Sequence, residues 1–339
     1  MSRLSVTRGK AKQRRLTHLR IETWGTRSLQ SRQRVPQSTM RLHCILAATL
    51  LCASTLHAQT APARAAIAQD PTPDKANPAA ILSFQLPSHG SQLNALVYVA
   101  AGAGPHPVVV LLHGFPGNER NLDLAQAIRR TGYDVLFFDY RGSWGTPGAF
   151  SFTHSLEDTQ AAIAYLRDPA NAKRLRSDPG NIILIGHSMG GFIARYVGAH
   201  DPAIRAVAII SAADMAVDTV ESIPFEHRSM AAIPIAKGFA AEGMAPLTGC
   251  TPESLANEVI ANADAWNIPN LAPALASRPM LVITSDDGNT PSNDAFTAAL
   301  RKAGDKQITT LHLATDHSYS GARIGLESAV LNFLATVPQ

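Results

Sequence analysis

The chain has 339 residues, of which 45% are hydrophobic, 17% charged and 6% aromatic. This composition is typical of a folded globular protein and excludes collagen, coiled coils and bulk disorder. The formal net charge is +4 and the isoelectric point is near 9.1, values that ordinarily suggest an anionic partner.

The positive charge is confined to the N-terminus. Residues 1–39 hold ten Lys and Arg residues and a single acid, Glu22. From Gln59 onward the chain has 19 basic and 25 acidic residues. Because nucleic-acid binding requires a basic surface on the folded domain, this distribution excludes nucleic acid as a partner.

Residues 40–58 have the layout of a secretory signal peptide. A short positive region precedes the apolar run Cys44–Leu56, and the small residue Ala58 follows it. The run is shorter than the roughly 20 residues that a bilayer span requires. We therefore predict translation from Met40, cleavage after Ala58, and export to the periplasm or the medium without a stable membrane span.

Two alternatives for this region are a retained amphipathic anchor and an Arg-rich transit peptide. Residues 1–39 have the Arg-rich, acid-poor bias of a transit peptide but no sustained apolar face. Of three cysteines, Cys44 and Cys52 lie in the predicted signal, so Cys250 would remain alone and no internal disulfide could form.

Residues 59–80 are rich in Ala and Pro without periodicity and predict a linker. Beyond it, β-branched apolar runs alternate with helical patterns. The predicted strands lie near 81–87, 92–100, 107–113, 134–139, 181–187, 204–211, 279–285 and 308–314.

Helical patterns lie between these runs, near 118–131, 155–167, 190–199, 293–303 and 321–335. Such alternation predicts an α/β domain over residues 81–339, with a mostly parallel eight-stranded sheet and helices on both faces. The pattern between about 213 and 277 contains helical fragments and no clear strand. We interpret that segment as a small helical cap insertion.

The segment 182–194 carries the strongest chemical signal. A buried strand pattern runs directly into Gly186-His187-Ser188-Met189-Gly190, and a helical pattern follows. This is Gly-x-Ser-x-Gly in the strand–turn–helix context that a nucleophilic serine requires. Glycines leave room for the sharp turn, and the helix N-terminus faces developing negative charge. We predict Ser188 as the catalytic nucleophile.

A nucleophilic serine needs a base, and the base needs an orienting acid. In this topology the acid follows the nucleophile and the histidine follows the acid, which leaves two histidines. His312 lies inside a predicted strand, whereas His317 lies in a loop. We therefore predict His317 as the base.

The predicted strand 279–285 ends in Asp286-Asp287-Gly288, at the carboxyl end where parallel sheets place their sites. Two adjacent carboxylates cannot both face one histidine. We predict Asp287 as the acid, with Asp286 as the alternative. Asp316 is expected to serve its own loop.

An oxyanion hole needs two backbone donors. One comes from the residue after the nucleophile, Met189, and the other from the loop His113-Gly-Phe-Pro-Gly117, where we assign it to Phe115. Trp144 and Phe150 are candidates for lining the substrate cleft, with buried packing as the alternative.

The remaining polar residues are expected to be structural. His113 and His187 should orient their turns, and Asp139 and Arg141 should form a pair. Cys250 has no metal-ligand spacing around it. Because the sequence contains no nucleotide-binding glycine loop, Cys-x-x-Cys or His-Glu-x-x-His, we expect no cofactor and no metal.

Taken together, His113-Gly-Phe-Pro-Gly117, Gly186-His-Ser-Met-Gly-Gly191, the Asp286-Asp287 pair and the late His317 resemble the α/β-hydrolase superfamily. The likeness spans about residues 81–339 and extends to exported serine esterase, lipase and peptidase-like branches. It implies a Ser-Asp-His hydrolase that acts through an acyl-enzyme. The chain departs from oligopeptidase-type peptidases at Met189, where they commonly carry an aromatic residue.

These features predict a serine hydrolase that cleaves carboxylic esters, because the candidate lining residues are apolar and nothing indicates a charged pocket for peptide termini. A peptidase or amidase, or an acyltransferase with the same triad, is the alternative. A non-catalytic binding protein would normally lose a triad member, and this sequence retains candidates for all three. The expected partner is a small ester or peptide-like substrate, and the oligomeric state is left open.

Overall fold

The computed structural model describes residues 61–215, 220 and 223–338. The chain divides into two units, Met1–Ser54 and Thr55–Gln339, and the described residues belong to the second. The predictions made for residues 1–58, including the signal peptide and its cleavage, lie outside the described residues.

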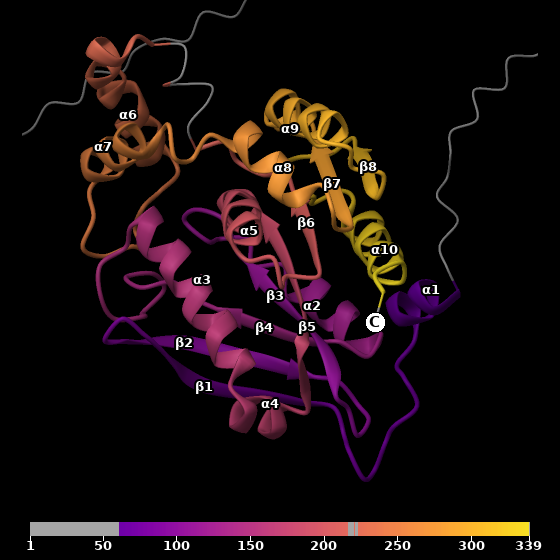
Figure 1. Ribbon diagram of the computed structural model, residues 1–339. Coiled ribbons are helices and arrows are strands. Elements are labelled where there is room, and N and C mark those ends of the chain that lie inside the picture. The colour runs from indigo at the N-terminus through magenta and orange to yellow at the C-terminus, as the bar shows by residue number, and fades with distance from the viewer. Residues whose placement is uncertain (1–60, 216–219, 221–222, 339) are drawn as a thin grey trace, which may run out of the picture. The chain divides into compact units, whose positions relative to one another are not determined.

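One eight-stranded sheet forms the centre of the domain, in the order β1-β2-β4-β3-β5-β6-β7-β8 (Figure 1). β1 and β2 pair antiparallel, as do β2 and β4, and all other neighbours are parallel. The predicted mostly parallel eight-stranded sheet is therefore confirmed. The strands are β1 (Ala80–Ser88), β2 (Ser91–Val99), β3 (His106–Leu112), β4 (Asp134–Phe138), β5 (Ser177–His187), β6 (Ala206–Ile210), β7 (Met280–Ser285) and β8 (Ile308–Leu313).

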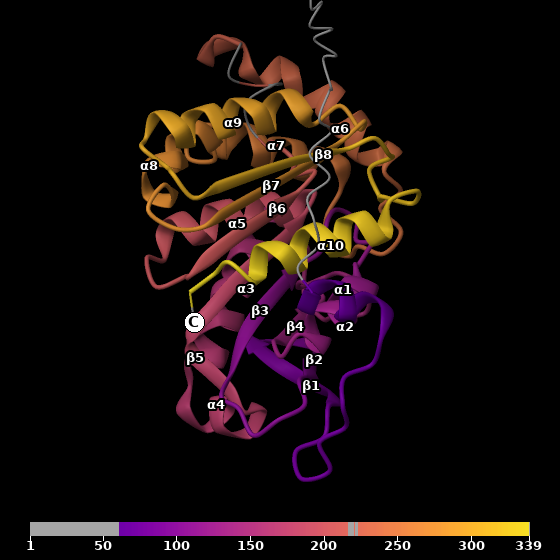
Figure 2. The same ribbon diagram turned by 90° about the vertical axis from the view of Figure 1, so that its right-hand side faces the viewer.

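Helices cover both faces of this sheet, because the central strands are apolar on both sides. Val108 and Val110 face one core, while Val109 and Leu111 face the other. The first core packs against α3 (Phe152–Arg167), α4 (Pro169–Leu175), α5 (Met189–His200) and α9 (Thr290–Lys302). The second packs against α2 (Leu122–Arg130) and α10 (Arg323–Leu334), which lie side by side in Figure 2.

The predicted linker is not wholly irregular. Residues Ala61–Ala68 form helix α1, which packs against α2 and α10 (Figure 2). Ala66 is buried there, and its carbonyl accepts a hydrogen bond from the Arg130 guanidinium. The segment is alanine-rich, and a surface to pack on turns that propensity into a helix.

The cap region is helical, with η2 (Phe225–Ala231), α6 (Ala232–Ala241), α7 (Pro252–Asn262), η3 (Ile268–Leu271) and α8 (Ala272–Leu275). α6 and α7 pack together, whereas η3 and α8 pack on α5 and α9 and so join the layer that covers the sheet. The Glu258 carboxylate of α7 accepts hydrogen bonds from the N–H groups of Phe152 and Thr153, at 3.0 and 2.7 Å. These contacts attach the cap to the N-terminus of α3.

Parallel pairing places the carboxyl ends of β5, β6, β7 and β8 at one edge of the sheet. The loops that follow β5, β7 and β8 carry Ser188, Asp287 and His317. Over the residues that the structure describes, no helix has the length and apolar character needed to cross a membrane.

Candidate active site

Ser188 occupies a strained turn between β5 and α5. Its φ is 57° and its ψ is −122°, a combination that a residue with a Cβ rarely adopts. The turn is held by two backbone hydrogen bonds of 2.9 Å, from Ser188 N–H to the Ile210 carbonyl and from Ala213 N–H to the Ser188 carbonyl. The strain is therefore supported by the end of the neighbouring strand β6.

The glycines around Ser188 are required by close approach. A Cβ on Gly186 would lie 1.9 Å from the Gly190 carbonyl oxygen, and one on Gly190 would lie 2.1 Å from that of Leu112. A Cβ on Gly114 would lie 2.8 Å from the Cβ of Ser188. Since real Cβ atoms do not approach so closely, the Gly-x-Ser-x-Gly spacing and the Gly114 loop are both steric requirements of this turn.

His317 and Asp287 form a hydrogen-bonded pair. His317 Nδ1 donates to Asp287 Oδ2 at 2.6 Å, and the Asp287 side chain is 3% exposed. Asp287 also accepts from the backbone N–H of Asn289 at 2.9 Å and from its side chain at 3.2 Å. Burial raises the pKa of Asp287, but hydrogen bonds from His317, Asn289 and Ser211 outweigh it and hold that pKa well below its usual range.

The alternative carboxylates have other partners. Asp286 pairs with His312 at 3.1 Å on the exposed surface. Asp316 accepts a hydrogen bond of 2.7 Å from the N–H of Ser320 within its own loop. Among these acids, the structure brings Asp287 to His317.

Ser188, His317, Asp287, Phe115 and Met189 all line one cavity of about 640 Å³. Most of the other lining residues are apolar, and helices α6 and α7 supply several of them. Its other lining residues are Phe152, Ala213, Asp214, Met215, Pro234, Ile235, Gly238, Phe239, Glu242, Val259 and Asn289. The cavity thus joins a serine, a His–Asp pair and an apolar chamber.

The N–H groups predicted to form an oxyanion hole belong to Met189 and Phe115, which line the same cavity as Ser188. Met189 is the first residue of α5, where an N–H has no partner within the helix. Phe115 lies in the loop that Gly114 presses against the serine. The turn and loop hydrogen bonds of the described residues use neither N–H, so both are available as donors.

The two residues predicted to line the cleft do not do so. Phe150 is buried outside the cavity lining, with its ring 5.8 Å from those of Phe115 and Phe152. Trp144 donates from Nε1 to the Pro116 carbonyl at 2.8 Å, and its ring packs against Arg120. The cavity is lined instead by aromatic residues from the cap and α3, such as Phe239 and Phe152.

The predicted Asp139–Arg141 pair is also wrong. Asp139 pairs with Arg120 at 3.3 Å, whereas Arg141 pairs with Asp158 at 2.7 Å and with Glu157. The two side chains find partners on different elements, because the chain turns sharply after β4. The interpretation of both as structural residues agrees with these contacts.

The turn histidines orient loops, as expected. The buried His113 ring donates from Nδ1 to the Gly114 carbonyl at 2.8 Å. The buried His187 ring donates from Nε2 to the His317 carbonyl at 2.8 Å, and the two rings lie 4.7 Å apart. Burial lowers the pKa of each to about 4, so both are neutral near pH 7 and hold the backbone on either side of the site.

A first prediction concerns the pH dependence of stability. Between pH 6.5 and about 4, His187 is protonated in the unfolded chain and neutral in the folded protein. The free energy of unfolding therefore decreases as the pH falls. This amounts to about 3 kcal/mol for one group. His187→Gln should therefore lose less unfolding free energy than the wild type between pH 7 and 4, as measured by urea denaturation. Parallel curves for the two proteins would contradict this account.

Sequence reasoning missed the residues that surround the pair and the chamber. Ser211 lowers the pKa of Asp287 and is hydrogen-bonded to Ser285 and Tyr319. Ile235, Phe239 and Val259 come from the cap. The only local signal was the apolar character of residues 232–241, which does not reveal what they cover. Among the residues that the structure describes, His, Cys, Asp and Glu form no cluster suited to a metal ion.

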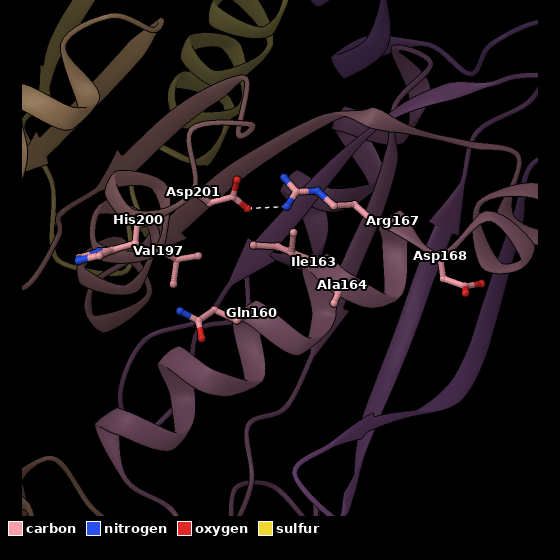
Figure 3. Close-up of a pocket in the computed structure, with 8 residues that line it drawn as sticks. All are labelled: Gln160, Ile163, Ala164, Arg167, Asp168, Val197, His200 and Asp201. Carbon is pink, nitrogen blue, oxygen red and sulfur yellow. Dashed lines mark hydrogen bonds and ion pairs between the residues drawn. The ribbon is translucent and has the colours of Figure 1, made fainter.

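A second cavity, of about 600 Å³, lies between α3 and α5 (Figure 3). The Arg167 guanidinium points toward Asp201 across it and pairs with it at 2.7 Å. The wall contains no serine or cysteine; its residues are Gln160, Ile163, Ala164, Arg167, Asp168, Val197, His200 and Asp201. This cavity therefore lacks the combination of a serine and a His–Asp pair that lines the first cavity.

Comparison with known proteins agrees with this architecture. The model of the alpha/beta hydrolase family matches residues 109–323, more than half of the chain. The chain therefore belongs to the α/β-hydrolase family. Its eight-stranded sheet with helices on both faces is the fold of that family.

Curated relatives match over shorter stretches. An uncharacterized protein of Mycobacterium tuberculosis is 31% identical over 106 residues, which make up 31% of this chain and 36% of that protein. The uncharacterized protein YfhR of Escherichia coli K12 is 32% identical over 124 residues, 34% of this chain and 41% of YfhR. The matches span less than half of either relative.

Among solved structures, the Pyrococcus furiosus esterase Pf2001 is similar over 76% of this chain and 93% of its own, with a TM-score of 0.55 and 14% identity. The carboxylesterase EstE1, cloned from a metagenomic library, is similar over 80% of this chain and 92% of its own, with a TM-score of 0.55 and 20% identity. At these identities the likeness concerns the fold.

Proposed function

We propose that this protein is a serine hydrolase that cleaves carboxylic esters through an acyl-enzyme, with Ser188 as nucleophile, His317 as base and Asp287 as the orienting acid. One observation carries the proposal: the strained serine shares a cavity with a hydrogen-bonded His–Asp pair. A strained turn persists where the surrounding structure enforces it, and such turns gather at active sites.

In the first half of the reaction, His317 Nε2 takes the proton of Ser188 Oγ as the oxygen attacks the ester carbonyl. Asp287 holds the imidazole through Nδ1 and stabilises the positive charge that forms on it. The resulting oxyanion accepts hydrogen bonds from the N–H groups of Phe115 and Met189, at the N-terminus of α5. His317 then returns the proton to the leaving alcohol, which departs from the acyl-enzyme.

In the second half, water replaces the alcohol. His317 removes a proton from the water, the hydroxide attacks the acyl carbon, and a second tetrahedral intermediate uses the same two N–H donors. Collapse of this intermediate releases the carboxylic acid and returns the proton to Ser188. The cycle needs no metal or cofactor.

The lining of the cavity favours an uncharged ester with an apolar acyl group. The rings of Phe115, Phe152 and Phe239 lie 5.3 to 5.9 Å from one another and offer a continuous aromatic wall. Asp214 and Glu242 are the other acids of the lining, which contains no Lys or Arg. A peptide carboxylate would find no cationic partner there, which argues for ester over peptide cleavage.

Location in the cell is part of the same proposal and rests on residues 40–58. Their signal-peptide pattern supports export to the periplasm or the medium, with cleavage after Ala58. The N-terminal sequence of the purified native protein tests this point, because a chain that retains residues 1–39 would contradict it.

The nucleophile can be tested without knowing the substrate. A fluorophosphonate probe reacts with an activated serine, and peptide mass spectrometry locates the adduct. We expect labelling of Ser188 that disappears in His317→Ala, together with hydrolysis of a neutral p-nitrophenyl ester. Folded protein that neither takes up the probe nor hydrolyses the ester would contradict the proposal and favour a binding role.

A further inference from the structure

Three hydroxyl groups meet beside Asp287, and the mechanism above does not use them. Ser211 follows β6, Ser285 ends β7, and Tyr319 lies two residues after His317. The oxygen of Ser211 lies 2.8 Å from that of Ser285 and 2.8 Å from that of Tyr319. All three residues are fully buried, so water does not compete for their hydrogen bonds.

The direction of these hydrogen bonds follows from proton counting. The Ser211 hydroxyl is among the groups that lower the pKa of Asp287, and toward an ionised carboxylate, which can only accept, a hydroxyl acts as a donor. On this ground we assign the single proton of Ser211 to Asp287. Either oxygen of the Ser211–Ser285 and Ser211–Tyr319 contacts can donate. With the Ser211 proton assigned to Asp287, the Ser285 and Tyr319 hydroxyls each donate to the Ser211 oxygen, which has two lone pairs to receive them. The three hydroxyls form a polarised network that ends on the acid.

The backbone is strained at two of the three positions. Ser211 has a φ of 42° and Tyr319 a φ of 58°, both in the left-handed region that favours glycine. Hydrogen bonds from Ser211 N–H to the Ile283 carbonyl at 2.8 Å, and from Tyr319 N–H to the Asp316 carbonyl at 3.0 Å, hold these conformations. Ser211 and Tyr319 therefore adopt strained backbone conformations, and these conformations bring their hydroxyls together near Asp287.

We propose that Tyr319 and Ser211 are positioning residues, which fix the Asp287 carboxylate against His317 Nδ1 and share its negative charge. This inference rests on the proposed function of the same site. A hydrogen bond from Ser211 spreads the carboxylate charge away from the imidazole. The network would therefore tune how strongly Asp287 stabilises protonated His317, as well as how it is oriented.

Other charged and titratable groups surround the pair and must stay constant in a test. The His187 ring lies 4.7 Å from that of His317. Arg323 donates to the Ser318 carbonyl at 3.1 Å, and Asp316 neighbours His317 in the chain. The Asp286–His312 pair lies on the exposed side. None of these groups is altered by substitutions at Ser211 or Tyr319.

Two variants remove hydroxyls without adding bulk. Tyr319→Phe deletes only the phenolic oxygen. Ser211→Gly deletes the hydroxyl and also suits the positive φ at this position, so it separates loss of the hydroxyl from backbone strain. The matched control is Tyr133→Phe, since Tyr133 is a buried tyrosine that donates to the Leu334 carbonyl at 3.0 Å, away from the site.

With the hydroxyls removed, the charge on Asp287 is concentrated toward the imidazole and holds a proton there more strongly. We expect the acidic limb of the kcat/KM profile to move up by about one pH unit in Ser211→Gly and about half a unit in Tyr319→Phe. kcat should fall roughly tenfold, with KM within about twofold. Tyr133→Phe should lower the melting temperature and leave the profile in place.

A second readout does not depend on catalysis. The proton between His317 Nδ1 and Asp287 Oδ2 should give a low-field NMR resonance, which we expect to move downfield in both variants. If that resonance and the acidic limb keep their wild-type positions, the network is merely structural and the inference is overturned. If the resonance moves in a protein that hydrolyses no ester, the inference stands and the proposed function fails.

Discussion

Ser188→Ala is expected to abolish ester turnover and to leave the fold intact. The substitution removes the oxygen that attacks the carbonyl, and comparable losses in serine hydrolases are roughly 10⁴-fold or more in kcat. Among the described residues, the Ser188 hydroxyl takes part in none of the side-chain hydrogen bonds that hold the fold, so the free energy of unfolding should change by no more than about 0.5 kcal/mol. Initial rates with a p-nitrophenyl ester and a thermal melt measure both effects.

Ser83→Ala provides the matched control, because Ser83 is exposed on the edge strand β1. This variant should keep full activity and full fluorophosphonate labelling. A Ser188→Ala protein that retained more than about one percent of the activity would place the nucleophile elsewhere. Loss of activity together with a collapsed melting transition would show that the fold, rather than the chemistry, had been damaged.

The second large effect is expected from two adjacent aspartates. Asp287→Asn should lower kcat by roughly 10³- to 10⁴-fold, because an amide no longer stabilises protonated His317 and can favour the wrong tautomer. Asp286→Asn should change kcat less than about twofold, since Asp286 lies on the surface with His312. The two variants make the same chemical change one residue apart, so each controls for the other.

The reverse result, with Asp286→Asn inactive and Asp287→Asn active, would show that the acid is misassigned. Stability offers an independent check. The depressed pKa of Asp287 stabilises the folded protein above the unfolded value of 3.8, and this contribution is lost as the pH falls. Asp287→Asn should therefore lower the melting temperature at pH 7, and the difference from the wild type should shrink in acid.

Local sequence patterns were sufficient to predict the scaffold. Continuous β-branched runs mark strands that are buried on both faces, and all eight predicted strands are present. The Gly-x-Ser-x-Gly turn could also be predicted from the sequence, because the close contacts that require its glycines include contacts between residues near each other in the chain, such as Gly186 and Gly190. The late position of His317 followed from the order of elements around a parallel sheet.

The incorrect predictions concern contacts between distant segments. Trp144 and Phe150 have side chains suited to lining an apolar cleft. In the loop after β4, however, Phe150 packs against Phe115, and Trp144 donates a hydrogen bond to the Pro116 carbonyl. Asp139 and Arg141 are close in the chain and face different partners. Propensity and spacing do not contain this information, since it depends on how a loop packs.

The sequence by itself determined the order of the strands and helices along the chain, the nucleophile turn and the candidate base, because these depend on local sterics and periodicity. Only the tertiary structure decided which of two adjacent carboxylates meets His317, which aromatic rings form the cavity, and which hydroxyls support Asp287. These pairings join residues such as Ser211 and Tyr319, which are 108 positions apart. Such contacts arise from packing helices and loops around the completed sheet.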